Sequence, residues 1–195
     1  MKKTILLLVI SAVATGAFAQ TDTAKKTATK QPAAKIRMVG GAQMSSANDV
    51  VKNLSVSKKH TVFVLMLTAT GVNETLKGST YTVFAPTDDA FKKLPAGTID
   101  SLMKPTHLAD LTKQVNGYIV QGKLRSTDIA KQIKSNGRAN ITTLSGSMLT
   151  ATVNSDRNIV LSDTSGNQAI VSQFDIEQSN GLVDVITSPL TPGAN

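Results

Sequence analysis

The sequence has no cysteine and no tryptophan, and aromatic residues make up 4% of its 195 residues. Without cysteine the chain can form neither disulfides nor thiolate metal sites, so apolar burial and hydrogen bonding must stabilise its fold. The scarcity of aromatic rings argues against a surface that stacks on nucleic-acid bases. With 41% hydrophobic residues, the chain is long enough for one domain with its own core.

The net charge of +8 is unevenly distributed along the chain. Lysine and arginine outnumber acids before residue 44, whereas basic and acidic residues are nearly balanced from 44 to 195. A nucleic-acid-binding domain needs a clustered basic face. We therefore predict no nucleic-acid partner.

The N-terminus has the order of features found in a secretory signal peptide. Lys2 and Lys3 precede an apolar run over residues 5–14, and Ala17-Phe18-Ala19 forms a small-residue cleavage site. A membrane anchor is the alternative, but the apolar run is shorter than the roughly 18–20 residues that span a bilayer. We expect residues 1–19 to be removed, leaving an exported protein, periplasmic or secreted, with no transmembrane segment in its mature chain.

Residues 20–43 are rich in threonine, alanine and lysine and poor in large apolar side chains. Such a segment cannot offset the entropy cost of ordering, so we predict a flexible basic linker followed by a domain over residues 44–195. Attraction to anionic polysaccharide or lipid headgroups is a further possibility for the linker, and a solvated spacer is the favoured interpretation.

The domain pattern predicts helices first and strands afterwards. Helices are expected near Val50–Leu54, over residues 107–115 with Leu108, Leu111 and Val115 inward, and over 126–134. Residues 61–67 fit either a buried strand or a buried helix. Strands are expected at about 140–144, 147–153, 158–162, 168–174 and 182–187. This arrangement predicts an α+β domain with an antiparallel sheet.

The segment "TVFAPTDDAF" (82–91) reads as a strand that leads into a helix. Pro86 ends the strand, and Thr87 suits the N-cap of the helix. Asp88 and Asp89 then fall in the first turn, where exposed N–H groups favour carboxylates. Phe91 is the expected core anchor of this helix.

We find no pattern that predicts a catalytic, cofactor-binding or metal site. His60 and His107 are expected at the surface or at helix starts, and neither has a partner at metal-ligand or nucleophile spacing. Asp88 and Asp89 are adjacent, and neighbours on a helix diverge by about 100°. We assign both to capping rather than to acid–base chemistry.

Two motifs resemble those of the fasciclin (FAS1) domain family. The first is "YTVFAPTDDAFKKLPAGTIDSLMKP", and the second is "DIEQSNGLVDVITSPLTP", whose Asn180-Gly181 turn leads into the last strand. The resemblance covers roughly residues 47–192. It implies a wedge-shaped β-sandwich with several short helices packed at one edge, and it favours a buried helix for residues 61–67.

The sequence departs from the family between these motifs. Where the family usually has a Tyr-His pair, this chain has Gly117 and Tyr118, and Gln121 stands at a proline position. Asp184 occupies a place in the last strand that is often histidine. We expect Tyr118 to be structural, with its ring beneath the strand and its hydroxyl bonded to the Thr87–Asp89 turn. A half-exposed tyrosine is the alternative.

The resemblance implies a non-catalytic extracytoplasmic binding module that adheres to extracellular matrix, polysaccharide or another surface protein. The weak candidates for binding or structural roles are Tyr118, Thr87, Asp88 and Asp89. An apolar ligand pocket between sheet and helices is the second hypothesis, and an unrecognised hydrolase is the third. No cofactor is predicted.

Overall fold

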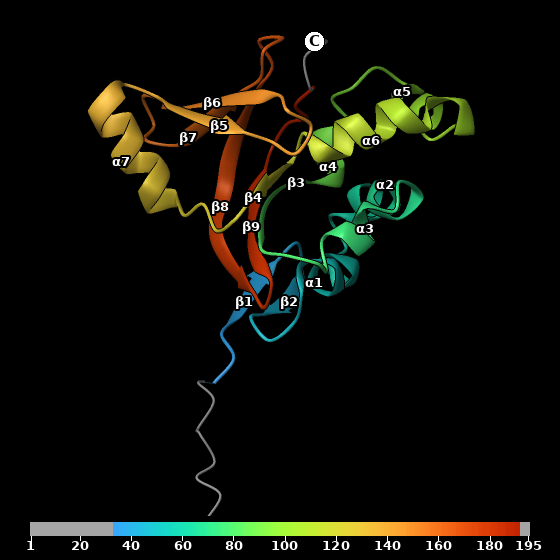
Figure 1. The fold of residues 1–195 in the computed structure, drawn as a ribbon, viewed down its shortest axis with the longest axis horizontal. Coiled ribbons are helices and arrows are strands. Elements are labelled where there is room, and N and C mark those ends of the chain that lie inside the picture. Colours follow the sequence, from blue (N-terminus) through green and yellow to red (C-terminus); the bar gives the residue numbers. More distant parts are fainter. Residues whose placement is uncertain (1–32, 192–195) are drawn as a thin grey trace, which may run out of the picture. The chain divides into compact units, whose positions relative to one another are not determined.

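The computed structural model of the chain describes residues 33–191. The predicted signal peptide, residues 20–32 of the predicted linker and residues 192–195 lie outside the described residues. Within residues 33–191, the described chain forms one compact unit. Its helices and strands occupy separate regions, with one helix on the far side of the sheet from the others (Figure 1).

The strands form a hairpin and a seven-stranded sheet with the order β4-β3-β9-β8-β7-β6-β5. The strands of the hairpin are β1 (Ile36–Val39) and β2 (Ala42–Ser45). The strands of the sheet are β3 (Tyr81–Pro86), β4 (Ile119–Gln121), β5 (Ala139–Thr142), β6 (Met148–Val153), β7 (Ile159–Ser162), β8 (Gln168–Gln178) and β9 (Gly181–Ile186). The strands expected after residue 139 are confirmed, and β8 runs four residues further than predicted.

The sheet is mixed rather than purely antiparallel, which corrects the sequence-based expectation. Strand β3 pairs in parallel with β9, from Tyr81 opposite Gly181 to Pro86 opposite Ile186. The other neighbouring strands of the sheet are antiparallel. Parallel pairing joins strands separated by about a hundred residues, and the local pattern of either strand carries no information about it.

The predicted boundary at residue 44 is wrong, because the β1–β2 hairpin begins eight residues earlier. Gly40 and Gly41 supply the positive φ angles of its two-residue turn, 57° and 78°. Val39 and Met44 are each 1% exposed and belong to the hydrophobic core. The entropy cost of ordering this segment is therefore offset by burial of two apolar side chains.

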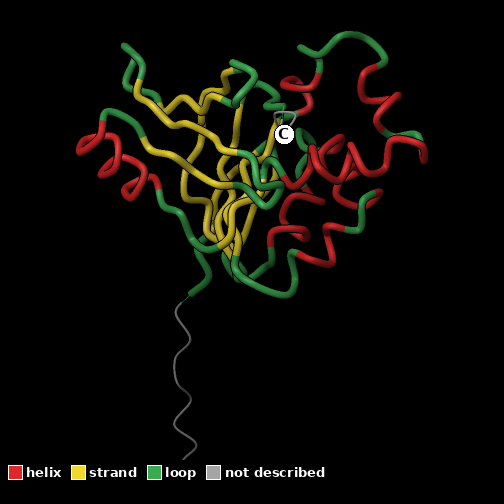
Figure 2. Tube along the Cα trace, turned by 45° about the horizontal axis from the view of Figure 1, so that its top comes forward, coloured by secondary structure: helices red, strands yellow, loops and turns green. Residues whose placement is uncertain are grey.

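Most helices gather on one side of the sheet, and α7 lies apart from them (Figures 1 and 2). The gathered helices are α1 (Val50–Val56), α2 (Thr61–Ala69), α3 (Val72–Thr75), α4 (Asp88–Phe91), α5 (Thr98–Leu102), the 3-10 turn η1 (Pro105–His107) and α6 (Leu108–Asn116). Helix α7 (Ser126–Asn136) packs beside β5 and β6. The predicted α+β class, with a sheet and several short helices, is confirmed.

Residues 61–67 form part of helix α2, as the family resemblance implied. One face of this helix buries Phe63, Met66 and Leu67, while Leu65 is 60% exposed. Burial of that face in the hydrophobic core outweighs the β-propensity of the segment, because tertiary packing routinely overrides local propensity.

Two other expectations about side-chain placement can be compared with the structure. His60 lies at a helix start, as one of its two expected positions, because it occupies the N-cap position of α2. It is fully buried rather than at the surface, with Nδ1 2.7 Å from the Ser57 hydroxyl. Burial lowers the pKa of His60 to about 4, so the ring is neutral near pH 7. Leu108, expected to face inward, is 47% exposed, whereas Leu111 and Val115 are buried as predicted.

The strand-to-helix step at residues 86–91 forms as the sequence predicts. The Thr87 hydroxyl accepts a hydrogen bond from the Ala90 amide at 3.1 Å, and Phe91 is 5% exposed within the hydrophobic core. Thr87 therefore contributes a single capping interaction, whereas Phe91 contributes a whole buried ring.

We predict that Phe91→Ala lowers the free energy of unfolding by about 3–5 kcal/mol through loss of core packing. Thr87→Ala is expected to cost about 1 kcal/mol through loss of the N-cap. Urea titration of both variants measures the order of the two effects. Equal effects, or a larger effect for Thr87→Ala, would contradict these assignments.

Candidate functional site

The four residues singled out from the sequence do not form one site. Thr87 caps α4, and the exposed Asp89 carboxylate lies 2.7 Å from the Lys92 ammonium. Asp88 begins α4 but caps a different helix. Its Oδ1 accepts the Val62 amide of α2 at 2.9 Å, and its Oδ2 accepts the Thr61 hydroxyl at 2.8 Å. Asp88 therefore joins α4 to α2.

Tyr118 is fully buried, so the half-exposed alternative is wrong. Its hydroxyl donates to the Leu190 carbonyl at 2.8 Å and accepts from Gln114 Nε2 at 2.9 Å. The predicted bond to the Thr87–Asp89 turn is therefore also wrong. The ring packs edge-on against Phe63, with centroids 5.6 Å apart. Burial raises the pKa of Tyr118 well above its ordinary value, so the phenol stays protonated at physiological pH.

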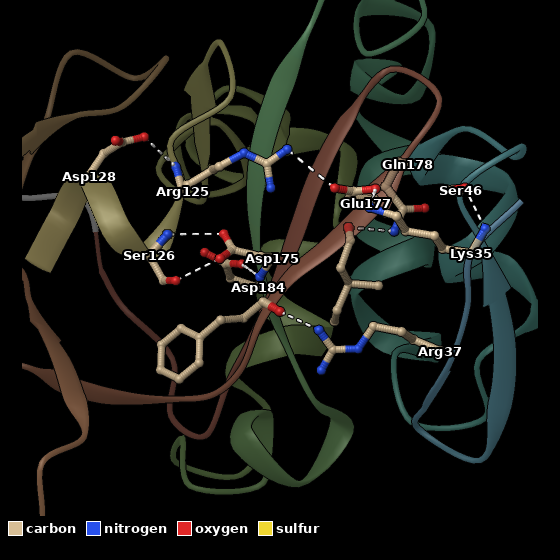
Figure 3. Close-up of polar contacts among 12 residues, drawn as sticks. Lys35, Arg37, Ser46, Arg125, Ser126, Asp128, Asp175, Glu177, Gln178 and Asp184 are labelled. Carbon is tan, nitrogen blue, oxygen red and sulfur yellow. Dashed lines mark hydrogen bonds and ion pairs between the residues drawn. The ribbon is translucent and has the colours of Figure 1, made fainter. Parts of the chain in front are cut away.

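A charged cleft of about 230 Å³ lies between strand β1 and the second half of β8. We use the name charged cleft for the space lined by Lys35, Arg37, Met44, Asp175, Ile176 and Glu177. Figure 3 shows its polar side chains and the start of α7 converging on β8. Sequence reasoning did not identify these lining residues as a site.

An irregularity in β8 positions the carboxylate of Asp175. The register with β9 shifts between Gln173 and Ile176, and Asp175 has a φ of 51°. Aspartate is among the non-glycine residues that most readily adopt this left-handed conformation. The Ser126 amide and hydroxyl donate to the Asp175 carboxylate at 3.0 and 2.6 Å. The bulge thus directs a carboxylate to the N-terminus of α7, where negative charge is favoured.

Cationic side chains from two other elements also contact β8. Lys35 and Arg125 pair with Glu177 at 2.9 and 3.2 Å. Hydrogen bonds from Lys35 and then Arg125 hold the pKa of Glu177 below its usual range. Arg37 Nη1 donates to the Phe174 carbonyl at 2.7 Å. These contacts attach β1 with the residue before it, and the residue before α7, to the same strand.

Asp184 lies behind the charged cleft on β9 and is fully buried. Its Oδ1 accepts the Asp175 amide at 2.8 Å, whereas its Oδ2 has no hydrogen-bond partner among the described residues. Burial raises the pKa of Asp184 from 3.8 to about 7, against the opposing effect of that hydrogen bond. The nearby Asp175 carboxylate raises this pKa further, and Arg37 lowers it. Near neutral pH this group can therefore gain or lose a proton.

A second, apolar pocket of about 240 Å³ lies in the helical region. It is lined by Met66, Phe91, Leu94, Thr98, Ile99, Leu102, Gln114 and Thr191. Typical small-molecule sites have about 300–1,000 Å³. The apolar pocket therefore fits a small apolar group rather than a large ligand.

Within residues 33–191, no group of three or more histidine, cysteine or acidic residues could hold a metal ion. No helix in this part of the chain is long and apolar enough to cross a membrane.

Two features of the sequence indicate parts of the charged cleft and its surroundings. Gly40-Gly41 between short segments containing Val39 and Met44 is typical of a two-residue hairpin, and this hairpin brings Arg37 to β8. Asp184 is the single acid in the apolar strand "GLVDVI". Such a residue indicates a buried carboxylate.

The sequence model described as "Fasciclin domain" matches residues 58–192 of this chain. Protein sll1483 of Synechocystis sp. is 32% identical over 178 residues, which cover 91% of this chain and 87% of that protein. The transforming growth factor-beta-induced protein ig-h3 of Oryctolagus cuniculus is 36% identical over 126 residues. That match covers 64% of this chain and 16% of the rabbit protein.

A solved structure of two FAS1 domains from the insect cell adhesion molecule fasciclin I has a similar fold. The TM-score is 0.53 at 21% sequence identity, covering 68% of this chain and 45% of that one. At this identity the likeness concerns the fold alone.

We predict that Tyr118→Phe lowers the free energy of unfolding by about 1–2 kcal/mol, because a buried hydroxyl with two well-placed partners is lost. Tyr81→Phe is the matched control, since no hydrogen bond among the described residues uses the Tyr81 hydroxyl. Its effect should be smaller in the same urea titration. An equal loss in both variants would contradict a structural role for the Tyr118 hydroxyl.

A second prediction concerns Asp184→Asn and pH. A carboxyl whose pKa is raised by folding stabilises the fold fully below its unfolded value of 3.8. This contribution is lost as the pH rises through about 7. Asparagine does not titrate, so the Asp184→Asn variant does not show this loss. From pH 5.5 to pH 8, the free energy of unfolding of the wild type should therefore fall by up to about 2 kcal/mol relative to that of the variant.

Urea titrations at both pH values test this prediction, with the exposed Asp89→Asn as control. Between pH 5.5 and 8, the free energy of unfolding of the Asp89→Asn control should change in parallel with that of the wild type. A wild type and an Asp184→Asn variant with the same pH dependence would show that Asp184 does not titrate in this window.

Proposed function

The chain belongs to the fasciclin domain family, and from this premise we propose that it is an exported, non-catalytic binding module. Its role is adhesion to extracellular matrix, polysaccharide or another surface protein. Its place is outside the cytoplasm, in the periplasm or the medium, as the N-terminal sequence predicts.

The observation that carries this proposal is the extent of the family match. Residues 58–192 include every element from α2 to β9, and hence the whole seven-stranded sheet. A protein of similar fold, fasciclin I, is an insect cell adhesion molecule. That role is transferred here as a proposal.

The charges of the cleft also favour surface contact over capture of a charged small molecule. Lys35 and Arg125 pair with Glu177, and Arg37 bonds to a backbone carbonyl. Paired charges of this kind offer little net attraction to an ion. The charged cleft therefore serves to hold β1 and α7 on β8 and so to shape the surface.

The apolar pocket favours a second candidate function, binding of a small apolar ligand. Its lining is predominantly apolar, with Gln114 and two threonines as the polar groups. Its volume of about 240 Å³ limits the ligand to a small ring or a short alkyl chain. Adhesion through the surface and ligand capture in this pocket predict different binding behaviour.

The test displays the protein on beads at increasing density over panels of immobilised glycans and matrix proteins. Adhesion predicts weak retention of single molecules and a steep rise with density, because linked modules bind with a high effective concentration. Ile99→Phe, which adds a bulky side chain at the apolar pocket, should leave this retention unchanged.

The pocket hypothesis predicts the opposite result. A fluorescent apolar probe or a short fatty acid would bind at one per protein, and Ile99→Phe would abolish that binding. Saturable probe binding without retention on any panel surface would replace adhesion by ligand capture as the function.

A further inference from the structure

The sheet has one surface of uncharged polar side chains that the sequence analysis did not single out. Its first row crosses β5, β6, β7 and β8 through direct strand partners, namely Asn140, Thr150, Ser162 and Gln168. Directly opposed residues of antiparallel strands project from the same face of a sheet. Thr142 and Thr152 lie on this face two residues from the row. We call this surface the neutral face.

The two sides of these strands have opposite environments. The alternate residues Ala139, Ile141, Leu149, Leu161 and Ala169 are buried in the hydrophobic core. On the neutral face, Asn140, Thr142 and Gln168 are exposed, and the remaining hydroxyl residues are half-buried. The neutral face is thus the solvent side of this part of the sheet.

No position on the neutral face carries a charge. Its other members are the exposed Met148 and Ile170 and the buried Val160, which join the hydroxyl residues by strand pairing. Charged residues do occur beside it, for instance Asp156 and Arg157 in the β6–β7 turn. Soluble protein surfaces ordinarily contain about 25–35% charged residues. A solvent-facing sheet surface without any charge is therefore a candidate for contact with an uncharged partner.

We infer that the neutral face is the contact surface for a neutral polysaccharide chain, an inference that rests on the adhesive function proposed above. Threonine, serine, asparagine and glutamine side chains each donate and accept hydrogen bonds, as sugar hydroxyls do. Binding such a chain does not require desolvation of a charged side chain. The threonine methyls with Ile170 and Met148 supply apolar contact for the C–H groups of a sugar ring.

The spacing of the face suits an extended polymer. Neighbouring strands are roughly 4.8 Å apart, and same-face residues along a strand are about 7 Å apart. A chain lying across the strands would therefore meet polar groups at regular intervals along the row from Asn140 to Gln168. Each contact is weak, and affinity grows with the number of modules engaged.

Two other classes of partner fit this surface less well. Anionic polymers and nucleic acids are bound through lysine and arginine, and the neutral face has neither. Cores of protein–protein interfaces are enriched in aromatic residues and arginine and depleted in serine. The neutral face has neither an aromatic residue nor an arginine, which disfavours a second copy of the chain.

The experiment measures retention of the bead-displayed protein on a neutral glucan, cellulose, and on an anionic polymer, polygalacturonate. Thr150→Val with Thr152→Val removes two hydroxyls and keeps the β-branched shape. Thr68→Val with Thr112→Val is the matched control, because both hydroxyls lie on helix surfaces and bond the carbonyl four residues earlier. Thermal melting checks that both double variants are folded.

We expect retention on cellulose that stays constant between about 0.05 and 1 M salt, because no charges are screened. The double variant Thr150→Val with Thr152→Val should have about tenfold lower affinity per module for cellulose, which is the equivalent of two weak hydrogen bonds. Thr150→Glu with Thr152→Glu should reduce it further, and the helix control should leave it unchanged.

Three results would overturn the inference. Retention on polygalacturonate that falls with salt, or cellulose retention unaffected by the Thr150/Thr152 variants, would leave the adhesive function standing and remove the neutral face from it. A dimer in sedimentation that Thr150→Glu with Thr152→Glu dissociates would assign the face to a second copy. Failure on every glycan and matrix surface would instead reject the proposed function itself.

Discussion

The parallel pairing of β3 with β9 is the constraint on which the rest of the domain depends. It places residues 81–86 against residues 181–186 and so joins the first helices to the last strand. At its start the two backbones touch, because a Cβ atom on Gly181 would lie 1.8 Å from the Tyr81 carbonyl oxygen. Any larger residue would displace one strand. At its other end the strand-to-helix step begins, so Thr87 and Asp88 can cap two helices.

The sequence predicted those features that depend on local pattern. Strands β5, β6 and the first part of β8 alternate buried and exposed side chains, and the turns after residue 139 have typical turn residues, so the positions of these strands could be expected. The Thr87 cap and the Phe91 anchor were predictable for the same reason. The β1–β2 hairpin was missed because the composition of residues 20–43 as a whole outweighed the local signal of Gly40-Gly41. Its stability comes from burial of Val39 and Met44 against distant segments.

The candidate site was less predictable because each of its parts depends on non-local geometry. Asp175 faces α7 because the register of β8 shifts, and no residue type signals that shift in advance. Asp184 has a raised pKa because the sheet around it excludes water. The Asp88 side chain was assigned correctly to capping, but the helix that it caps, α2, begins near the start of α4 only in the folded chain. The Tyr118 hydroxyl similarly finds Leu190, seventy-two residues later.

The charges of the cleft are arranged so that they act within the domain rather than on a partner. Glu177 is shared between Lys35 and Arg125, and Asp175 is bonded by the start of α7. These contacts attach a hairpin and a helix to β8, the strand that also carries Gln168 and Ile170 of the neutral face. Loss of the Asp184 proton would add a buried charge beside Asp175, on the strand next to β8. Because β8 is common to both regions, the contacts that fix the charged cleft also fix the strand that carries part of the neutral face.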